Sequence, residues 1–155
     1  MKGPRDWTVG TDLPERVLRP VDRLSLIRYA GASGDFNPIH TIDEEAREAG
    51  LPGVIQHGML TMAQMGLLLT PYIEDGFIEL FQTRFVGMLP LGETLRLGGR
   101  VTAVEPRENG VRFSCDVHAR TTEGRAIARG SLRFVWYGPR AEISENTRSR
   151  PTTAG

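Results

Sequence analysis

The chain has 155 residues, enough for one domain with a buried core, and its 39% hydrophobic and 25% charged residues are ordinary for a globular protein. Its 19 basic and 19 acidic residues cancel to a formal net charge of zero, which argues against nucleic acid or an anionic membrane surface as a partner. The N-terminal residues lack the apolar segment of a signal peptide, and no apolar run approaches a membrane span, so we expect a cytoplasmic protein without a membrane anchor.

We expect a single domain over residues 1–137. Its first 12 residues have the composition of a loosely held N-terminal arm, and residues 138–155 are polar and end in Pro, Thr and Gly, which predicts a flexible C-terminal tail. The single cysteine, Cys115, excludes an intrachain disulfide. It alternates in phase with apolar neighbours on both sides, so we expect a buried and inert thiol.

The first two helices are predicted from their ends. Asp22 can cap a helix over residues 23–30, and the glycine-rich residues 31–34 are then expected to open a loop. A second, shorter helix is predicted over residues 43–49, because its acidic start suits a helix N-terminus and Gly50 suits a helix end.

Residues 58–69 form the most apolar segment, and apolar side chains occur nearly all round it until Pro71 ends the pattern, which predicts a buried central helix. From residue 77 onward the apolar period changes to two, as expected for strands. Glu108–Gly110 and Thr122–Gly124 mark turns between successive strands. The sequence therefore predicts an α+β fold, in which an antiparallel β-sheet is wrapped around one long central helix.

The strand pattern also predicts two faces for this sheet. The residues expected on the inner face of one strand are Leu95, Leu97, Gly99, Val101 and Ala103. Small residues at alternate positions of the last strand leave room for a helix across the sheet. The arginines expected on the outer face are Arg96, Arg100, Arg129 and Arg133.

The stretch GDFNPIH, residues 34–40, places a carboxylate and an imidazole five residues apart. The residue before proline is pushed out of the helical region, so we expect Asp35 and His40 on an ordered loop. Together they could form a pair that removes one proton and supplies another. His57 and Gly58 begin the central helix, where a backbone N–H can stabilise a developing oxyanion and the lack of a side chain lets a ligand approach.

From the residues alone, structural roles stay open beside this chemistry. Asp35 could be a turn-forming carboxylate, Asn37 an Asx turn before Pro38, and His57 a helix cap. Asp35, His40 and His57 are also ligand types for zinc. No HxxxH or CxxC spacing supports a metal site, so we expect neither a metal nor a cofactor.

Two longer motifs, YAGASGDFNPIH at residues 29–40 and IQHGM at residues 55–59, closely resemble those of the MaoC-like dehydratases, the (R)-specific enoyl-CoA hydratases. Residues 84–86 and 90–95 look like the strand–turn–strand signature of the same family, so the resemblance covers residues 9–137. It implies a hot-dog fold. It also implies a homodimer or a dimer of dimers, with the acyl thioester entering near the subunit interface.

The resemblance implies a site as well. Asp35 and His40 match the catalytic pair, and the backbone N–H of Gly58 matches the oxyanion donor. The supporting residues that it implies are Ser33, Asn37 and His57. At Gly66 the chain departs from a serine that some members carry, which puts pocket shape and chain-length preference in doubt.

The implied function is that of a hydro-lyase in fatty-acid metabolism. It would add water to trans-2-enoyl thioesters to give (3R)-3-hydroxyacyl thioesters, or run the reverse dehydration, with CoA or acyl carrier protein as the thioester carrier. The outer arginines could meet the phosphates of CoA. Three alternatives stay open: the catalytic subunit of a heterodimeric (3R)-hydroxyacyl-carrier-protein dehydratase, a hot-dog acyl-CoA thioesterase, and a non-catalytic acyl-CoA-binding protein.

Overall fold

The computed structural model describes residues 3–138, so residues 139–155 of the predicted tail and the first two residues of the predicted arm lie outside the described part. The helices are η1 (Pro4–Asp6), α1 (Arg23–Ser33), η2 (Pro38–His40), α2 (Asp43–Glu48), α3 (Gly58–Gly66) and η3 (Thr70–Asp75), where η marks a 3₁₀ helix. The strands are β1 (Arg16–Val17), β2 (Gly76–Phe85), β3 (Leu95–Arg107), β4 (Gly110–Thr121) and β5 (Ala126–Trp136).

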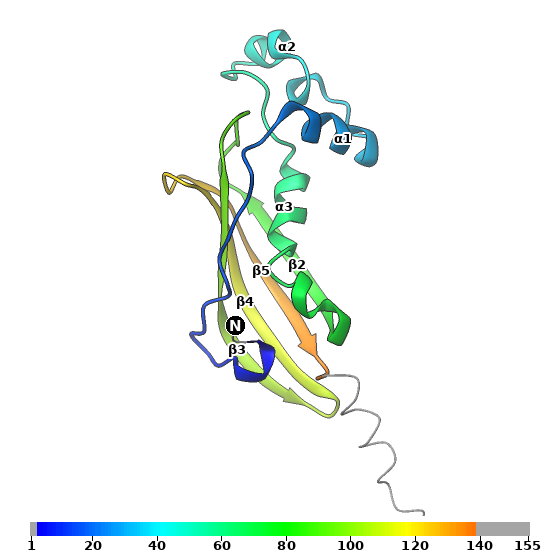
Figure 1. The fold of residues 1–155 in the computed structure, drawn as a ribbon, viewed down its shortest axis with the longest axis vertical. Coiled ribbons are helices and arrows are strands. Elements are labelled where there is room, and N and C mark those ends of the chain that lie inside the picture. Colours follow the sequence, from blue (N-terminus) through cyan, green and yellow to red (C-terminus); the bar gives the residue numbers. More distant parts are fainter. Residues whose placement is uncertain (1–2, 139–155) are drawn as a thin grey trace, which may run out of the picture.

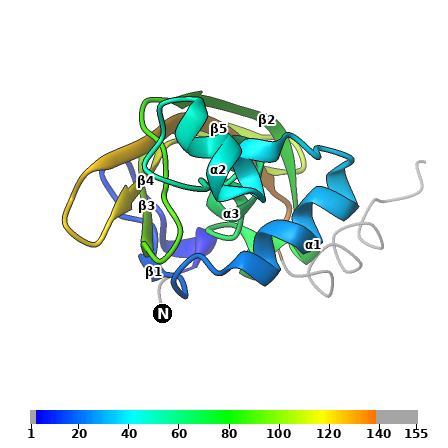
Figure 2. The same cartoon turned by 90° about the horizontal axis from the view of Figure 1, so that it is seen from above.

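The five strands form one antiparallel sheet in the order β1-β3-β4-β5-β2. Helix α3 lies along one face of the sheet, and α1 and α2 sit together at one end of the molecule (Figure 1). Viewed from above, the sheet curves around the helical layer (Figure 2). The predicted turns at 108–110 and 122–124 join β3 to β4 and β4 to β5, and the predicted α+β class is confirmed.

Helix α1 begins where its cap predicts and ends later than expected. The side chain of Asp22 accepts a hydrogen bond of 2.7 Å from the backbone N–H of Ser25, which confirms the predicted cap. The helix continues through residues 31–33, which the sequence placed in a loop. It ends at Ser33, because the next residue, Gly34, adopts a left-handed φ of 75° that a right-handed helix cannot continue through, whereas Gly31 does not have a positive φ.

Helix α3 is shorter than predicted and only partly covered. It ends at Gly66, because the amides of Leu67 and Leu68 bond three residues back and tighten the chain into 3₁₀ geometry. Thr61 and Met65 are buried, whereas Met59 is 56% exposed. A single sheet covers one side of a helix, so the apolar residues all round α3 leave one side uncovered in the single chain.

The core between sheet and helices contains the side chains predicted to point inward, with one change of phase. A β-bulge between Val101 and Ala103 moves the alternation of β3 by one residue. Consequently Val104, rather than the predicted Ala103, packs against the core. Cys115 is buried as predicted, and burial raises the pKa of its thiol to about 12.

The N-terminal arm is attached to this core through Trp7, which is 4% exposed. Its ring packs edge-on against Tyr72 and Phe113, with centroid separations of 5.1 and 5.2 Å. No helix within residues 3–138 combines the length and the apolar character needed to cross a membrane.

Candidate active site

The loop that carries Asp35 is held by short-range hydrogen bonds. The backbone N–H of Asp35 donates to the hydroxyl of Ser33 at 3.2 Å. The N–H of Asn37 donates to Asp35 Oδ1 at 3.2 Å, and Asn37 Oδ1 accepts from the N–H of Ile39 at 3.3 Å, where η2 begins. These are the Asx turns that the Asn-Pro sequence favours, and they orient one carboxylate oxygen while leaving the other available.

His40 lies at the end of η2 and is buried, with 7% of its surface exposed. Its Nδ1 is 2.8 Å from the carbonyl oxygen of Ile55. A carbonyl oxygen only accepts hydrogen bonds, so Nδ1 carries a proton, and in the neutral ring Nε2 has a free lone pair. That Nε2 faces Asp35 Oδ2 across 3.9 Å.

His57 contacts both residues of this pair. Its Nε2 donates a hydrogen bond of 3.2 Å to the backbone oxygen of Asp35, and its ring stacks on that of His40 with centroids 3.8 Å apart. Tyr29 packs edge-on against His57 at 4.9 Å. Burial, followed by the proximity of His40, lowers the pKa of His57, so this ring is neutral. Among the residues that the structure describes, its buried Nδ1 has no hydrogen-bond partner, as expected for an unprotonated nitrogen.

Gly58 is the first residue of α3 and is exposed. The first amides of a helix have no acceptor within it, and the helix dipole adds partial positive charge there. The ring of Phe85 lies 3.4 Å from the point that a β-carbon at residue 58 would occupy. Glycine therefore keeps the N–H accessible beside an aromatic ring.

The gap between Asp35 and His40 is too long for a direct hydrogen bond and suits one bridging water, about 2.8 Å from each atom. The nearest ligand-type atoms of Asp35, His40 and His57 all lie within 4.8 Å of one another, which is the scale of a metal site. The two imidazole planes differ by only 26°, so their lone pairs run side by side instead of meeting at one point. This arrangement favours acid/base chemistry over metal binding.

All of the predicted site residues therefore lie in one region of the fold, where α1, η2 and the start of α3 meet. Sequence reasoning missed two of its residues, Tyr29 and Phe85, although both lie within segments that carry the family resemblance. Nothing in their residue types signals the site. Exposed apolar side chains lie close to the site residues in sequence: Phe36, Met59, Phe85, Val86 and Met88.

The four arginines predicted on the outer face differ in whether they have an acidic partner. Arg96 pairs with Glu15 at 3.2 Å, and Arg100 pairs with Asp12 at 2.7 Å, so acidic residues near the N-terminus neutralise both. Within the described part of the chain, Arg129 and Arg133 have no such pairing. The prediction that these arginines meet the phosphates of CoA stays a prediction.

The chain is similar in sequence to proteins of known name. The chain is 48% identical over 50 residues to 3-hydroxyacyl-thioester dehydratase X of Mycobacterium tuberculosis, a match that covers 32% of this chain and 18% of that protein. It is 35% identical over 102 residues to the fatty acid synthase beta subunit TOXC of Cochliobolus carbonum, covering 64% of this chain and 5% of that protein. The chain thus spans a small part of these curated relatives.

Solved structures place the fold. The (R)-hydratase from A. caviae involved in PHA biosynthesis matches with a TM-score of 0.74 and 21% identity over 85% of this chain and 98% of that one. The ChsH1–ChsH2 complex of Mycobacterium tuberculosis matches with a TM-score of 0.72 and 20% identity over 83% and 98%. The predicted hot-dog fold is confirmed. Residues 6–122 match the family model of the MaoC-like domain, and the protein belongs to this family of dehydratases.

Proposed function

We propose that the protein is a hydro-lyase that adds water across the C2=C3 bond of a trans-2-enoyl thioester, giving the (3R)-3-hydroxyacyl thioester, or that catalyses the reverse dehydration. The observation that carries this proposal is the separation of 3.9 Å between His40 Nε2 and Asp35 Oδ2, beside the N-terminus of α3. Relatives named (R)-hydratase and 3-hydroxyacyl-thioester dehydratase support it.

In the hydration direction, the pair holds the attacking water. His40 Nε2 removes a proton as the water oxygen bonds to C3, and the π electrons of C2=C3 move onto the thioester oxygen. Protonated Asp35 delivers its proton to C2 on the same face as the electrons return. A second water then carries the proton of His40 back to Asp35 and restores both groups.

The backbone N–H of Gly58 stabilises the negative charge on the thioester oxygen in the transition state. A preorganised amide at a helix N-terminus needs no reorganisation when this charge develops. Phe85, over the same residue, would exclude water from that oxygen and strengthen the interaction.

The ultraviolet absorbance of the conjugated enoyl thioester tests the proposal. With crotonyl-CoA and longer enoyl-CoA substrates, wild-type protein should remove this absorbance. Asp35→Asn and His40→Ala should each slow the loss about a hundredfold or more, whereas Asp75→Asn, a carboxylate change outside the site, should not. Inertness of the wild type toward a range of CoA and acyl-carrier-protein thioesters, alone and with any co-purifying partner, would refute the hydro-lyase assignment.

The same assay separates the competing activities. A thioesterase would release free thiol from acyl-CoA, which a thiol reagent detects at once, without requiring a double bond. A non-catalytic acyl-CoA-binding protein would retain the enoyl absorbance while binding the ligand. The Asp35–His40 pair around a water-sized gap favours the hydro-lyase over both.

We infer further that a second subunit covers the open side of α3. Met59 on α3 and Phe36 beside Asp35 are 56% and 68% exposed, which leaves an apolar surface next to the site. Within the described residues, β2 is also an edge strand of the sheet, paired on one side only. A homodimer or a dimer of dimers would bury this surface, and a heterodimer with a related chain is the alternative, as the paired ChsH1–ChsH2 complex illustrates for a relative.

A further inference from the structure

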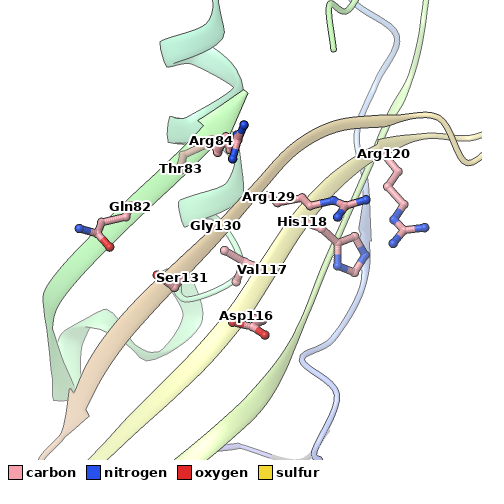
Figure 3. A pocket seen from close by; sticks show the side chains of 10 residues that line it. All are labelled: Gln82, Thr83, Arg84, Asp116, Val117, His118, Arg120, Arg129, Gly130 and Ser131. Atoms are coloured by element: carbon pink, nitrogen blue, oxygen red, sulfur yellow. The ribbon is translucent and has the colours of Figure 1, made fainter. Parts of the chain in front are cut away.

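A groove of about 650 Å³ lies over β2, β4 and β5, apart from the residues of the Asp35–His40 site (Figure 3). Arg129 and Ser131 line it and alternate along β5 with buried Ala128 and Leu132, which face the core. The groove is therefore on the outer face of the sheet, on the side away from α3.

Strand register aligns three basic side chains across this groove. His118 on β4 lies directly opposite Arg129 on β5, and Arg129 lies directly opposite Arg84 on β2. Residues directly opposite on antiparallel strands have β-carbons about 5 Å apart, and like charges in such positions destabilise a sheet. Arg120 lies two residues beyond His118 on the same face and also lines the groove.

Among the described residues, the groove arginines Arg84, Arg120 and Arg129 have no counter-ion, whereas several other sheet arginines do. Four other sheet arginines have acidic partners, and the pairs are Arg96–Glu15, Arg100–Asp12, Arg107–Glu105 and Arg112–Glu79. Within residues 3–138, no carboxylate lies within ion-pairing distance of Arg84, Arg120 or Arg129. Uncompensated positive charge gathered over a concavity favours an anion from outside the chain.

His118 forms one wall of the groove, and the residue opposite it on the neighbouring strand β3 has no side chain. A β-carbon at Gly98, opposite His118 on β3, would lie 2.9 Å from its Nε2, so glycine there makes room for the imidazole. Burial, followed by the charge of Arg120, lowers the pKa of His118. The ring can therefore act as a neutral hydrogen-bond donor beside the guanidinium groups.

A second row runs parallel to the basic one. Asp116, Ser131 and Gln82 lie opposite one another across β4, β5 and β2, two residues away along each strand. Their carboxylate, hydroxyl and amide groups are suited to hydroxyl or amide groups of a ligand. The groove thus joins a cationic row to a neighbouring hydrogen-bonding row, and its volume is in the range of small-molecule sites.

We propose that this groove binds a phosphate ester of a polar small molecule, with the phosphate on Arg84 and Arg129 and the polar remainder along the second row. The planar guanidinium groups can each donate two hydrogen bonds to phosphate oxygens. A bound dianion would also relieve the repulsion between the two opposed arginines. The proposal rests on the sheet alone and is independent of the hydro-lyase assignment.

Calorimetric titration of the full chain with ADP at low ionic strength tests the site. We expect ADP to bind, and Arg129→Gln or Arg84→Gln to weaken binding by about tenfold or more. The control is Arg133→Gln, which removes an equal charge from the same face of β5 outside the groove and should leave affinity within about twofold. No binding to the wild type, or equal loss in Arg133→Gln, would overturn the proposal.

Two further measurements test the stability of the variant and the identity of the phosphate-bearing ligand. If Arg129→Gln folds, its unfolding temperature at low salt should exceed that of the wild type, since one of two opposed charges is gone, and ADP should raise it less. A lower unfolding temperature with the full ADP shift retained would contradict the proposal.

Titrations with inorganic phosphate and CoA then identify the source of the phosphate. Equal affinities indicate that the phosphate group alone is bound, and tighter binding of CoA indicates a thioester carrier.

Discussion

At the scale of single residues, the site depends on which nitrogens carry protons. The carbonyl of Ile55 leaves His40 Nε2 free to act as a base, and the backbone oxygen of Asp35 keeps a proton on His57 Nε2. Two imidazoles stacked at 3.8 Å cannot both be charged without strong repulsion. A neutral His57 therefore preserves the geometry in which His40 can accept a proton.

The lowered pKa of His57 predicts a pH-dependent stability. The unfolded chain takes up this proton more readily than the folded one, so the stabilising contribution is complete above the ordinary histidine pKa of 6.5 and is lost as the pH falls below it. His118 acts in the same direction. Thermal unfolding followed from neutral to mildly acidic pH should show a falling midpoint, with a shallower fall in His57→Gln. An unchanged slope in that variant would contradict a neutral, buried His57.

At the scale of elements, the two ends of α1 have different consequences. Asp22 caps its start, far along the helix from the site, whereas left-handed Gly34 ends it immediately before Asp35. The position of the carboxylate thus depends on how the helix ends.

A pair of variants at these ends separates stability from activity. Asp22→Ala should lower the free energy of unfolding by about 1 kcal/mol through loss of the cap and leave activity unchanged. Gly34→Ala should cost about 1–2 kcal/mol because alanine is strained at a φ of 75°, and it should also lower kcat by displacing Asp35. Chemical denaturation and enoyl-CoA turnover measured on the same samples give both quantities. Equal turnover in the two variants would exclude a positioning role for Gly34.

At the scale of the whole molecule, the exposed apolar residues near β2 and α3 argue for an assembly. Phe77 on the edge strand β2 is 57% exposed, and Val9 on the N-terminal arm is 65% exposed. Phe77→Lys should shift the native mass from a dimer toward a monomer and lower activity with it, because a charge at an edge strand resists pairing. Val9→Lys serves as the matched control and should change neither. Mass spectrometry under native conditions, with activity measured at each protein concentration, tests this prediction. A Phe77→Lys protein that keeps the wild-type mass would exclude this surface as the interface.

The domain limits predicted at residues 1–137 stay a prediction, which truncation tests. Deletion of residues 139–155 should leave the unfolding temperature and the turnover of enoyl-CoA unchanged, because all strands of the described sheet and both residues of the Asp35–His40 pair lie within residues 3–138. A loss of either would place part of the tail in the fold or the site.

Several structural features of this protein depend on local physical chemistry alone, so the sequence by itself determined them. The cap at Asp22, the hairpin at 108–110 and the alternation around Cys115 depend on neighbouring residues only, and all three are confirmed. The GDFNPIH motif likewise predicts an ordered loop with Asp35 and His40 on it, because the Asx turns that hold it span two residues each.

Contacts between distant segments were decided by the tertiary structure alone. The stack of His40 on His57 and the position of Phe85 over Gly58 require packing of η2, α3 and β2, which no local pattern encodes. The alignment of the cationic row and the hydrogen-bonding row on the outer face depends on strand register, which the bulges in the sheet shift by one residue at a time. A shift of one residue exchanges the two faces of a strand, so the sequence could predict the alternation within each strand but not which side chains would meet across the sheet.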